Sequence, residues 1–202
     1  MRPRVFFATL TLASATVLAA GNESPKVEIQ GGTASFEAAT NVPAILIHGR
    51  SSALEGHARI RHDADGLVIE GLEAALPVRT LITGMGLRDE HMRKYVFTTA
   101  DGLLPDVRFV SERAVCSGAG RTQRCQLSGD LIIRDTPRPF TMDLKVSDEG
   151  PQFHASGDGV VKLSAYGITP PSQLGVRALD DVKLRVDFVV KRVDERVAHG
   201  TR

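Results

Sequence analysis

The sequence predicts an all-β domain whose antiparallel strands close into a barrel or pack as a sandwich. Apolar and polar residues alternate with a period of two along most of the chain, which is typical of strands with one buried face. Turn pairs such as Asp65-Gly66, Asp101-Gly102 and Glu149-Gly150 separate the alternating segments. Because no crossover helices lie between them, eight or more such strands favour a single barrel or sandwich.

The N-terminal segment is typical of a secretory signal peptide. Arg2 and Arg4 are followed by an uncharged run, Val5–Ala20, and then by the small residue Gly21. A membrane anchor is the alternative, but this run of 16 residues is shorter than the ~20 that a spanning helix needs. We expect residues 1–20 to be cleaved during export and residues 21–202 to form one domain.

Four segments show the clearest strand alternation. They are Val107–Glu112, Leu127–Arg134, Phe140–Ser147 and Val182–Val190, each apolar on one face and mostly polar on the other. Weaker alternation predicts further strands along the rest of the chain. These are Lys26–Gln30, Ala34–Ala39, Ala44–Arg50, Leu54–His62, Leu67–Gly71, Leu76–Ile82 and Gln152–Ser164.

One segment, Gly86–Phe97, departs from the alternation and predicts a helix. Its acids lie near its start and its bases near its end, which suits the helix dipole. Asp89–Arg93 and Glu90–Lys94 are acid-before-base pairs at a spacing of four, which stabilises a helix further. A second short helix or loop is expected around Gly167–Leu179.

The two cysteines, Cys116 and Cys125, flank a Gly-containing stretch that predicts a hairpin tip. In the oxidising compartment that a signal peptide implies, they favour a disulfide. Closing a loop of this size would stabilise the fold by roughly 2–3 kcal/mol. The alternative is a pair of free thiols, and the spacing is too long for a CxxC redox site.

Charge and composition exclude several classes of function. The chain has 25 Lys+Arg against 24 Asp+Glu, and loss of residues 1–20 removes Arg2 and Arg4, leaving 23 bases against 24 acids. This balance offers no bulk charge for holding nucleic acid or an anionic membrane. Zero Trp and 2 Tyr leave few flat rings for stacking on bases or sugars. The apolar content is therefore mainly aliphatic.

Candidate catalytic and metal-binding residues are few. The sequence has no G-x-S-x-G elbow, and His57 and His62 would point to opposite faces of a strand, which argues against a shared metal. His91 lies beside Arg88 and Asp89 on the predicted helix. Two roles stay open for this group: a hydrogen-bond network that ties the helix to the barrel, or an enzyme site. We expect neither catalytic residues nor metal ligands.

The interior of the predicted barrel has two possible states. A barrel of about eight strands can fill its interior with side chains or enclose one small apolar ligand. The predicted inner faces use aliphatic residues and Phe with several Gly and Ala, and no Trp is available to plug them. Periodicity alone leaves both states open.

Several motifs together resemble the YceI-like family. Thr83-Gly84, Arg88-Asp89-x-His91-Met92 and Leu104–Ser111 are similar in residue type and spacing to its signature of T-G, R-D-x-H-L and Y-P-x-I-x-F-x-S. Leu127–Arg134 is similar to its G-x-L-T-I-R strand, and Val182–Arg192 fits its terminal strand. The resemblance covers about Ala44–Arg192.

This resemblance implies a lipocalin-like, eight-stranded antiparallel barrel with one or two short helices, secreted to the bacterial periplasm. It also implies a long hydrophobic cavity for a polyisoprenoid or an isoprenoid quinone, with no other cofactor. Its structural motif comprises Thr83, Gly84, Arg88, Asp89 and His91. The predicted lining residues have the inward parity of their strands or lie on the predicted helix. They are Val107, Phe109, Leu131, Ile133, Phe140, Met142, Leu144, Leu184, Val186, Phe188, Met92 and Tyr95.

Three motifs depart from the family pattern. Gly49-Arg50-Ser51 stands for G-x-F, and Asp135–Arg138 stands for the G-x-T-R turn. Leu163–Ile168 keeps the aromatic-Gly-Ile of R-x-D-F-G-I but loses its Arg and Asp. Because of these changes, the identity of the ligand and its polar contacts near the mouth of the barrel do not transfer.

The leading hypothesis is a non-enzymatic periplasmic carrier of an apolar lipid. We expect no nucleic-acid partner and no stable membrane insertion, and the sequence leaves a homodimer open. The alternative is a stress-response or interaction barrel without a lipid ligand. An enzyme, such as a hydrolase or isomerase using His91 with Asp89, ranks third.

Overall fold

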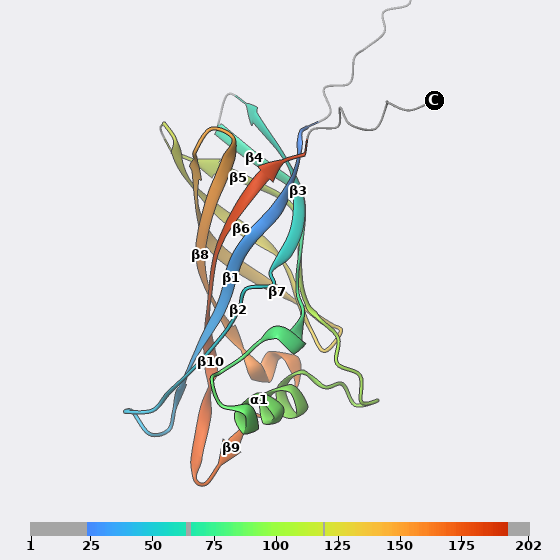
Figure 1. The fold of residues 1–202 in the computed structure, drawn as a ribbon, viewed down its shortest axis with the longest axis vertical. Helices are drawn as coiled ribbons and strands as arrows, with labels where there is room; N and C mark the ends of the chain where they lie inside the picture. Colours follow the sequence, from blue (N-terminus) through green and yellow to red (C-terminus); the bar gives the residue numbers. More distant parts are fainter. Residues whose placement is uncertain (1–23, 64–65, 119, 194–202) are drawn as a thin grey trace, which may run out of the picture.

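The protein is a barrel with short helices at one end (Figure 1). The structure is a computed structural model and describes residues 24–63, 66–118 and 120–193, so the predicted signal peptide lies outside the described residues. The strands are β1 (Lys26–Thr40), β2 (Leu46–Ser51), β3 (Glu55–Asp63), β4 (Gly66–Leu76), β5 (Val107–Ser117), β6 (Thr122–Ile133), β7 (Thr136–Asp148), β8 (Gln152–Lys162), β9 (Ser172–Gln173) and β10 (Val176–Arg192).

The long strand β1 closes the barrel. One edge of β1 pairs with β10 along nearly its whole length. Its other edge pairs first with β3, at Lys26–Glu28, and then with β2, at Ala34–Ala39. β2 and β3 therefore share one position in the wall. From β3 to β8 each strand pairs with the next one in the chain, and β8 then pairs with β10, because β9 pairs only with the start of β10. The predicted eight-stranded antiparallel barrel is confirmed.

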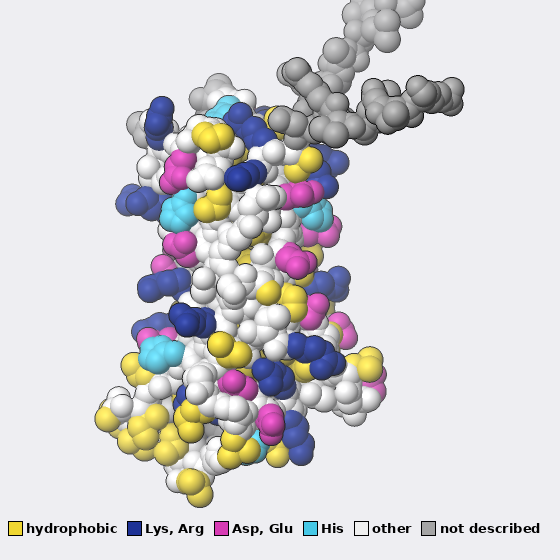
Figure 2. Space-filling model, viewed as in Figure 1, with side chains coloured by type: hydrophobic (Ala, Val, Ile, Leu, Met, Phe, Trp, Pro, Cys, Tyr) yellow, Lys and Arg dark blue, Asp and Glu magenta, His cyan; other side chains and the backbone are white. Residues whose placement is uncertain are grey.

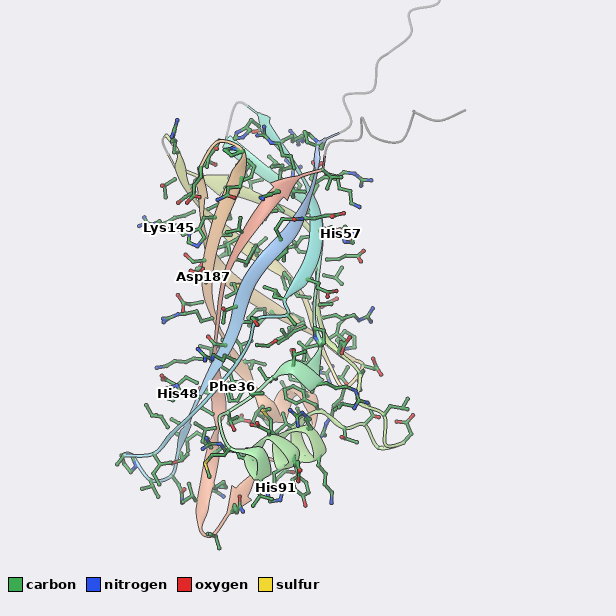
Figure 3. All side chains as sticks on the ribbon, in the orientation of Figure 1. Phe36, His48, His57, His91, Lys145 and Asp187 are labelled. Carbon is green, nitrogen blue, oxygen red and sulfur yellow. A yellow bond between two sulfur atoms is a disulfide. The ribbon has the colours of Figure 1, made fainter. Side chains whose placement is uncertain are left out.

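The predicted alternation is confirmed on the strands where it is clearest. On β7, Phe140, Met142, Leu144 and Val146 are buried, and the residues between them are exposed. Lys145, one of these exposed residues, projects outward from the wall in Figure 3. Apolar side chains from the whole ring therefore meet inside the barrel and form one core.

The predicted strands Lys26–Gln30 and Ala34–Ala39 are in fact parts of the single strand β1. The intervening Gly31 and Gly32 suggest a turn, but they lie on the ladder with β10. A methyl group at Gly32 would lie 2.3 Å from Cβ of Phe188, so this position needs glycine because the two strands approach closely.

The prediction of a strand at Leu76–Ile82 is wrong. β4 ends at Leu76, and the next residue is Pro77, which has no N–H to donate to a ladder. The chain instead forms a 3-10 turn, η1 (Val78–Thr80), with the N–H of Thr80 donating to the carbonyl of Pro77 at 3.0 Å. Val78 is fully buried in this turn.

The predicted helix is confirmed. α1 (Gly86–Met92) continues into a π-helical turn, η2 (Arg93–Phe97). A second 3-10 turn, η3 (Leu163–Tyr166), precedes the expected excursion at Gly167–Leu179, which proves to contain the short hairpin of β9 and β10. Within the part of the chain that the structure describes, no helix is long and apolar enough to cross a bilayer.

The two ends of the barrel differ. We call the lower end in Figure 1 the cap end: it carries α1, all three η turns and the β1–β2, β6–β7 and β9–β10 connections. The far end carries the β3–β4, β5–β6 and β7–β8 connections. The predicted disulfide between Cys116 and Cys125 is confirmed, and it joins β5 to β6 near the far end.

Candidate ligand-binding site in the barrel interior

One side of the barrel interior is filled by side chains of β6 and β7. A methyl group added at Gly159 of β8 would lie 2.5 Å from Cζ of Phe140, and one at Gly157 would lie 2.9 Å from Cδ1 of Leu144. The β7 side chains therefore lie over the glycines of β8 and leave no room there. Five of the predicted lining residues belong to this packed side: Leu131, Ile133, Phe140, Met142 and Leu144.

The other predicted lining residues on strands are only partly buried. β5 and β10 are four positions apart in the ring of eight, so they face each other across the interior. Both strands turn apolar side chains inward that pack against the core yet keep part of their surface accessible. These residues are Val107 and Phe109 on β5 and Leu184, Val186 and Phe188 on β10.

Phe109 marks the boundary between these two sides. Its ring meets the ring of Phe140 edge to face, with centroids 6.0 Å apart. This geometry is favourable for two aromatic rings. Phe109 thus links the incompletely buried side of the interior to the packed side on β7.

Two grooves lie on the outer wall. The larger, of about 510 Å³, is lined by Glu37, His48, Lys183 and Arg185 and by Thr83 and Gly84 of the cap end. Its lining also includes the apolar residues Phe36, Ile82 and Leu184, of which Leu184 is a predicted lining residue. Lys183 lies 3.0 Å from Glu37, and its hydrogen bond and charge lower the pKa of that carboxyl. The smaller, of about 350 Å³, also has charged side chains in its lining. The charged side chains in these linings do not suit a wholly apolar ligand.

The helical segments cover the interior at the cap end. Met92 of α1 and Phe97 of η2 are each only 8% exposed and belong to the core. Tyr95, by contrast, is 50% exposed, and Nζ of Lys94 lies 5.3 Å from its ring centroid. Of the two lining residues predicted on this helix, Met92 faces the interior, whereas Tyr95 lies on the solvent side.

The structural motif brings three of its five residues together. Thr83 donates to Oδ1 of Asp89 from its N–H at 2.7 Å and from its hydroxyl at 2.5 Å. Arg88 in turn donates from Nε to Oγ1 of Thr83 and from Nη2 to its carbonyl, both at 2.9 Å. Gly84, with φ of 82°, allows the chain to turn between Thr83 and α1.

The pKa of Asp89 follows from these contacts. Burial alone would raise the pKa, since the side chain is only 8% exposed. The two hydrogen bonds from Thr83 and the charges of Arg93 and Arg88 outweigh burial and hold the pKa below its ordinary value. Asp89 is therefore a charged anchor inside the cap.

His91, the fourth polar residue of the motif, points elsewhere. Its ring meets the ring of Tyr95 edge to face, with centroids 5.6 Å apart. Asp89 is committed to Thr83, and residues two positions apart on a helix lie on different faces. The geometry thus provides a positioning network rather than a coupled acid and base. Within residues 24–63, 66–118 and 120–193, no group of three or more His, Cys, Asp or Glu side chains could hold a metal ion.

A second plug, which sequence reasoning missed, closes the cap end beside α1. Tyr166 of η3 is 6% exposed and donates its hydroxyl to the carbonyl of Leu131 at 3.1 Å. Burial raises its pKa to about 12. Ile168 beside it is 1% exposed. The aromatic-Gly-Ile motif at this position was the available signal, because it survives although the flanking Arg and Asp are lost.

Arg134 of the β6–β7 turn and Arg138 of β7 each bond to one of these two cap segments. Arg134 donates to the carbonyl of Tyr95, and Nε of Arg138 donates to the carbonyl of Ala165 at 2.6 Å. Nε of Arg134 and Nε of Arg93 are themselves buried and have no hydrogen-bond partner among the described residues. Buried donors without a partner are rare in folded proteins.

A closed antiparallel barrel of eight strands with an apolar interior and a capped end is a lipocalin-like barrel. Residues 26–190 match the family described as the YceI-like domain, and the chain therefore belongs to that family. The resemblance seen in the motifs is confirmed. Comparison with curated proteins found no match.

Solved structures share this fold at low sequence identity. BcnA of Burkholderia cenocepacia is 17% identical with a TM-score of 0.59, over 79% of this chain and 96% of BcnA. A polyisoprenoid-binding domain from Saccharophagus degradans is 12% identical with a TM-score of 0.60, over 83% of this chain and 98% of that domain. The YceI protein of Campylobacter jejuni is 16% identical with a TM-score of 0.52, over 96% of this chain and 94% of that protein.

Proposed function

We propose that this protein is a non-enzymatic carrier that binds a long apolar ligand, such as a polyisoprenoid or an isoprenoid quinone, inside the barrel. The observation that carries the proposal is the pair of facing strands, β5 and β10, whose inward apolar side chains are incompletely buried. A prenyl chain left in water costs roughly 0.8 kcal/mol for each methylene-sized group. Side chains such as Phe109, Val186 and Phe188 offer that chain an apolar surface of matching character.

The polarity of the interior supports a hydrocarbon ligand. Thr40, Ser51, Asp89 and Ser111 are the buried polar or charged side chains among the described residues. Ser111 donates to the carbonyl of Ser128 at 2.7 Å, so its hydroxyl needs no hydrogen-bond acceptor from a ligand.

The binding experiment is native mass spectrometry of the purified protein, before and after organic extraction and after addition of a polyprenol or a long-chain quinone. We expect an adduct of several hundred daltons that extraction removes and the added lipid restores. A clean apo protein that takes up neither lipid contradicts the proposal and favours an interaction barrel without a ligand.

Two variants test whether the ligand occupies the interior. Val186→Phe adds bulk on the inner face of β10, whereas Val160→Phe adds the same bulk on the outer face of β8, where Val160 is 56% exposed. We expect Val186→Phe to keep its thermal stability and lose the adduct, and Val160→Phe to keep both. If Val186→Phe instead unfolds at a lower temperature with no change in adduct, the interior is solid.

We further propose that the carrier works in the periplasm. The Cys116–Cys125 disulfide supports an oxidising compartment, and the predicted signal peptide at residues 1–20 supports export. Osmotic-shock fractionation followed by N-terminal sequencing should give a periplasmic protein that starts near Gly21. Recovery in the cytosolic fraction with Met1 intact contradicts this location.

A further inference from the structure

The cap end exposes an unusual amount of apolar side chain. Large apolar residues are exposed mainly at this end, and much less along the wall. The exposed large apolar residues at the cap end are Val42, Ile45, Leu46, Ile82, Met85, Leu87, Tyr95, Leu103, Leu174 and Leu179. A concentration of this kind on one face marks an interaction surface.

The tip of the β1–β2 hairpin is apolar throughout. Val42, Pro43, Ala44, Ile45 and Leu46 follow one another, and every one of them is exposed. Figure 2 shows the corresponding group of hydrophobic side chains at the lower left of the molecule. A run of exposed apolar residues weakens solubility and is retained where it serves a function.

Leu174 at the tip of the β9–β10 hairpin is the most exposed large apolar residue of the described chain, at 97%. It has φ of 49° and the following Gly175 has φ of 80°. A turn with two positive φ values favours Asn-Gly, and a leucine in the first position is strained. Leu174 therefore destabilises the fold in two ways. Its backbone conformation is strained, and its apolar side chain is exposed to water.

These two hairpin tips form one unit, which we call the tip pair (Asn41–Leu46 and Ser172–Arg177). Nδ2 of Asn41 donates to the carbonyl of Gly175 at 3.1 Å, and the N–H of Arg177 donates to Oδ1 of Asn41 at 2.7 Å. The backbone of Asn41 also donates to the carbonyl of Arg177 at 2.9 Å. The hydrogen bonds fix both apolar tips side by side.

The charges without a partner around the tip pair are positive. Asn41–Leu46 and Ser172–Val176 contain no charged residue, and the nearest arginines that follow are Arg50 and Arg177. The nearest acids are already engaged: Glu37 by Lys183, Asp180 by Ser164 and Asp181 by Lys162. Both arginines are exposed, and neither belongs to an ion pair among the described residues. A second copy of the chain would bring the same positive charges against them, whereas the phosphates of a bilayer are opposite in sign.

We infer that the tip pair docks the barrel on a lipid bilayer, with Ile45 and Leu174 entering the boundary between head groups and acyl chains and Arg50 and Arg177 contacting phosphates. Two apolar tips that protrude side by side suit insertion into a soft medium better than contact with a rigid protein face. This docking is peripheral, and it holds whether or not the interior carries a lipid.

The experiment is flotation of the purified protein with mixed phosphatidylcholine and phosphatidylglycerol vesicles. Leu174→Asn is the informative variant, because asparagine is favoured in this turn and the fold should become no less stable. We expect the wild type to float with the vesicles. Leu174→Asn combined with Ile45→Asn should lower the partition coefficient by about tenfold or more, since two buried aliphatic side chains are lost.

Val160→Asn is the matched control, since it removes an apolar side chain that is 56% exposed on the wall, away from both tips. It should float as the wild type does, and all variants share the same termini. The proposal is overturned if the wild type stays in the soluble fraction. It is also overturned if the double variant floats as well as the wild type does. A wild-type dimer in sedimentation velocity that the double variant converts to monomer overturns it too, because the tips would then be covered by a second copy.

Discussion

Thr83 and Asp89 are joined by two hydrogen bonds that end on a single carboxylate oxygen. The N–H of Thr83 lies 2.7 Å and its hydroxyl 2.5 Å from Oδ1 of Asp89. The residue before Thr83, Ile82, exchanges two backbone hydrogen bonds with Arg50 of β2, at 2.9 and 3.0 Å. The helix that caps the barrel is thereby attached to the barrel wall through one buried carboxylate.

Replacing Asp89 with Asn should destabilise the protein by about 2–3 kcal/mol at neutral pH, because hydrogen bonds to a buried charge are lost. The pKa of Asp89 is lower in the folded than in the unfolded state. Its contribution is therefore present above the unfolded pKa of about 3.9 and lost as the pH falls through the folded pKa. Urea unfolding of wild type and variant at neutral and acidic pH measures this difference.

Glu90→Gln is the matched control for this prediction, because Glu90 is the next residue on α1 and is exposed. Its effect on the free energy of unfolding should stay within about 0.5 kcal/mol. A destabilisation by Asp89→Asn that is the same at neutral and acidic pH would show that the charge of Asp89 is not what holds the cap.

The hydroxyl of Tyr166 should titrate far above the ordinary range, with a pKa of about 12, because it is buried. The unfolded value is about 10, so Tyr166 favours the fold below that pH and loses its contribution as the pH rises through the folded pKa. Phenolate absorbance in a Tyr95→Phe background reports Tyr166 alone, since the chain has 2 Tyr. A midpoint near 10 in folded protein contradicts the burial of this hydroxyl.

The barrel could be predicted because its physical cause is local. Strand alternation needs only the parity of neighbouring residues, and Phe140, Met142 and Leu144 have the inward parity that the structure shows. The disulfide was predictable for the same reason, since Cys116 and Cys125 lie on either side of one hairpin tip. The motif at Thr83–Asp89 could be located, but its hydrogen bonds could not.

What escaped prediction depends on contacts between distant segments. Gly32 lies in a strand that Phe188 of β10 approaches closely. The residues next to Gly32 in the sequence do not indicate this contact. Tyr166 bonds to Leu131, 35 residues away, and so closes the barrel beside α1. The incomplete burial of β5 and β10 is likewise a property of the closed ring. The periodicity of the sequence predicts which residues face inward, but it does not predict how closely their side chains pack against one another.

Replacing Cys116 and Cys125 together with Ser should destabilise the protein by about 2–3 kcal/mol, because the unfolded chain regains the entropy of a loop of about ten residues. Thermal unfolding of the wild type in the presence of a reductant should approach that of the double variant. Two reactive thiols in denatured, unreduced wild type would contradict the disulfide itself.

Gly159→Ala should destabilise the protein by about 1–3 kcal/mol, because the new methyl group would overpack the interior. It would lie 2.5 Å from Cζ of Phe140, whose ring is already packed edge to face against the ring of Phe109. Gly31→Ala is the matched control: it lies on a strand too, with nothing within 4 Å of the added methyl group, and should be neutral or slightly stabilising. Equal stability of the two variants in urea unfolding would mean that the β7–β8 side of the barrel is loosely packed. The space for a ligand would then extend beyond the facing inner surfaces of β5 and β10.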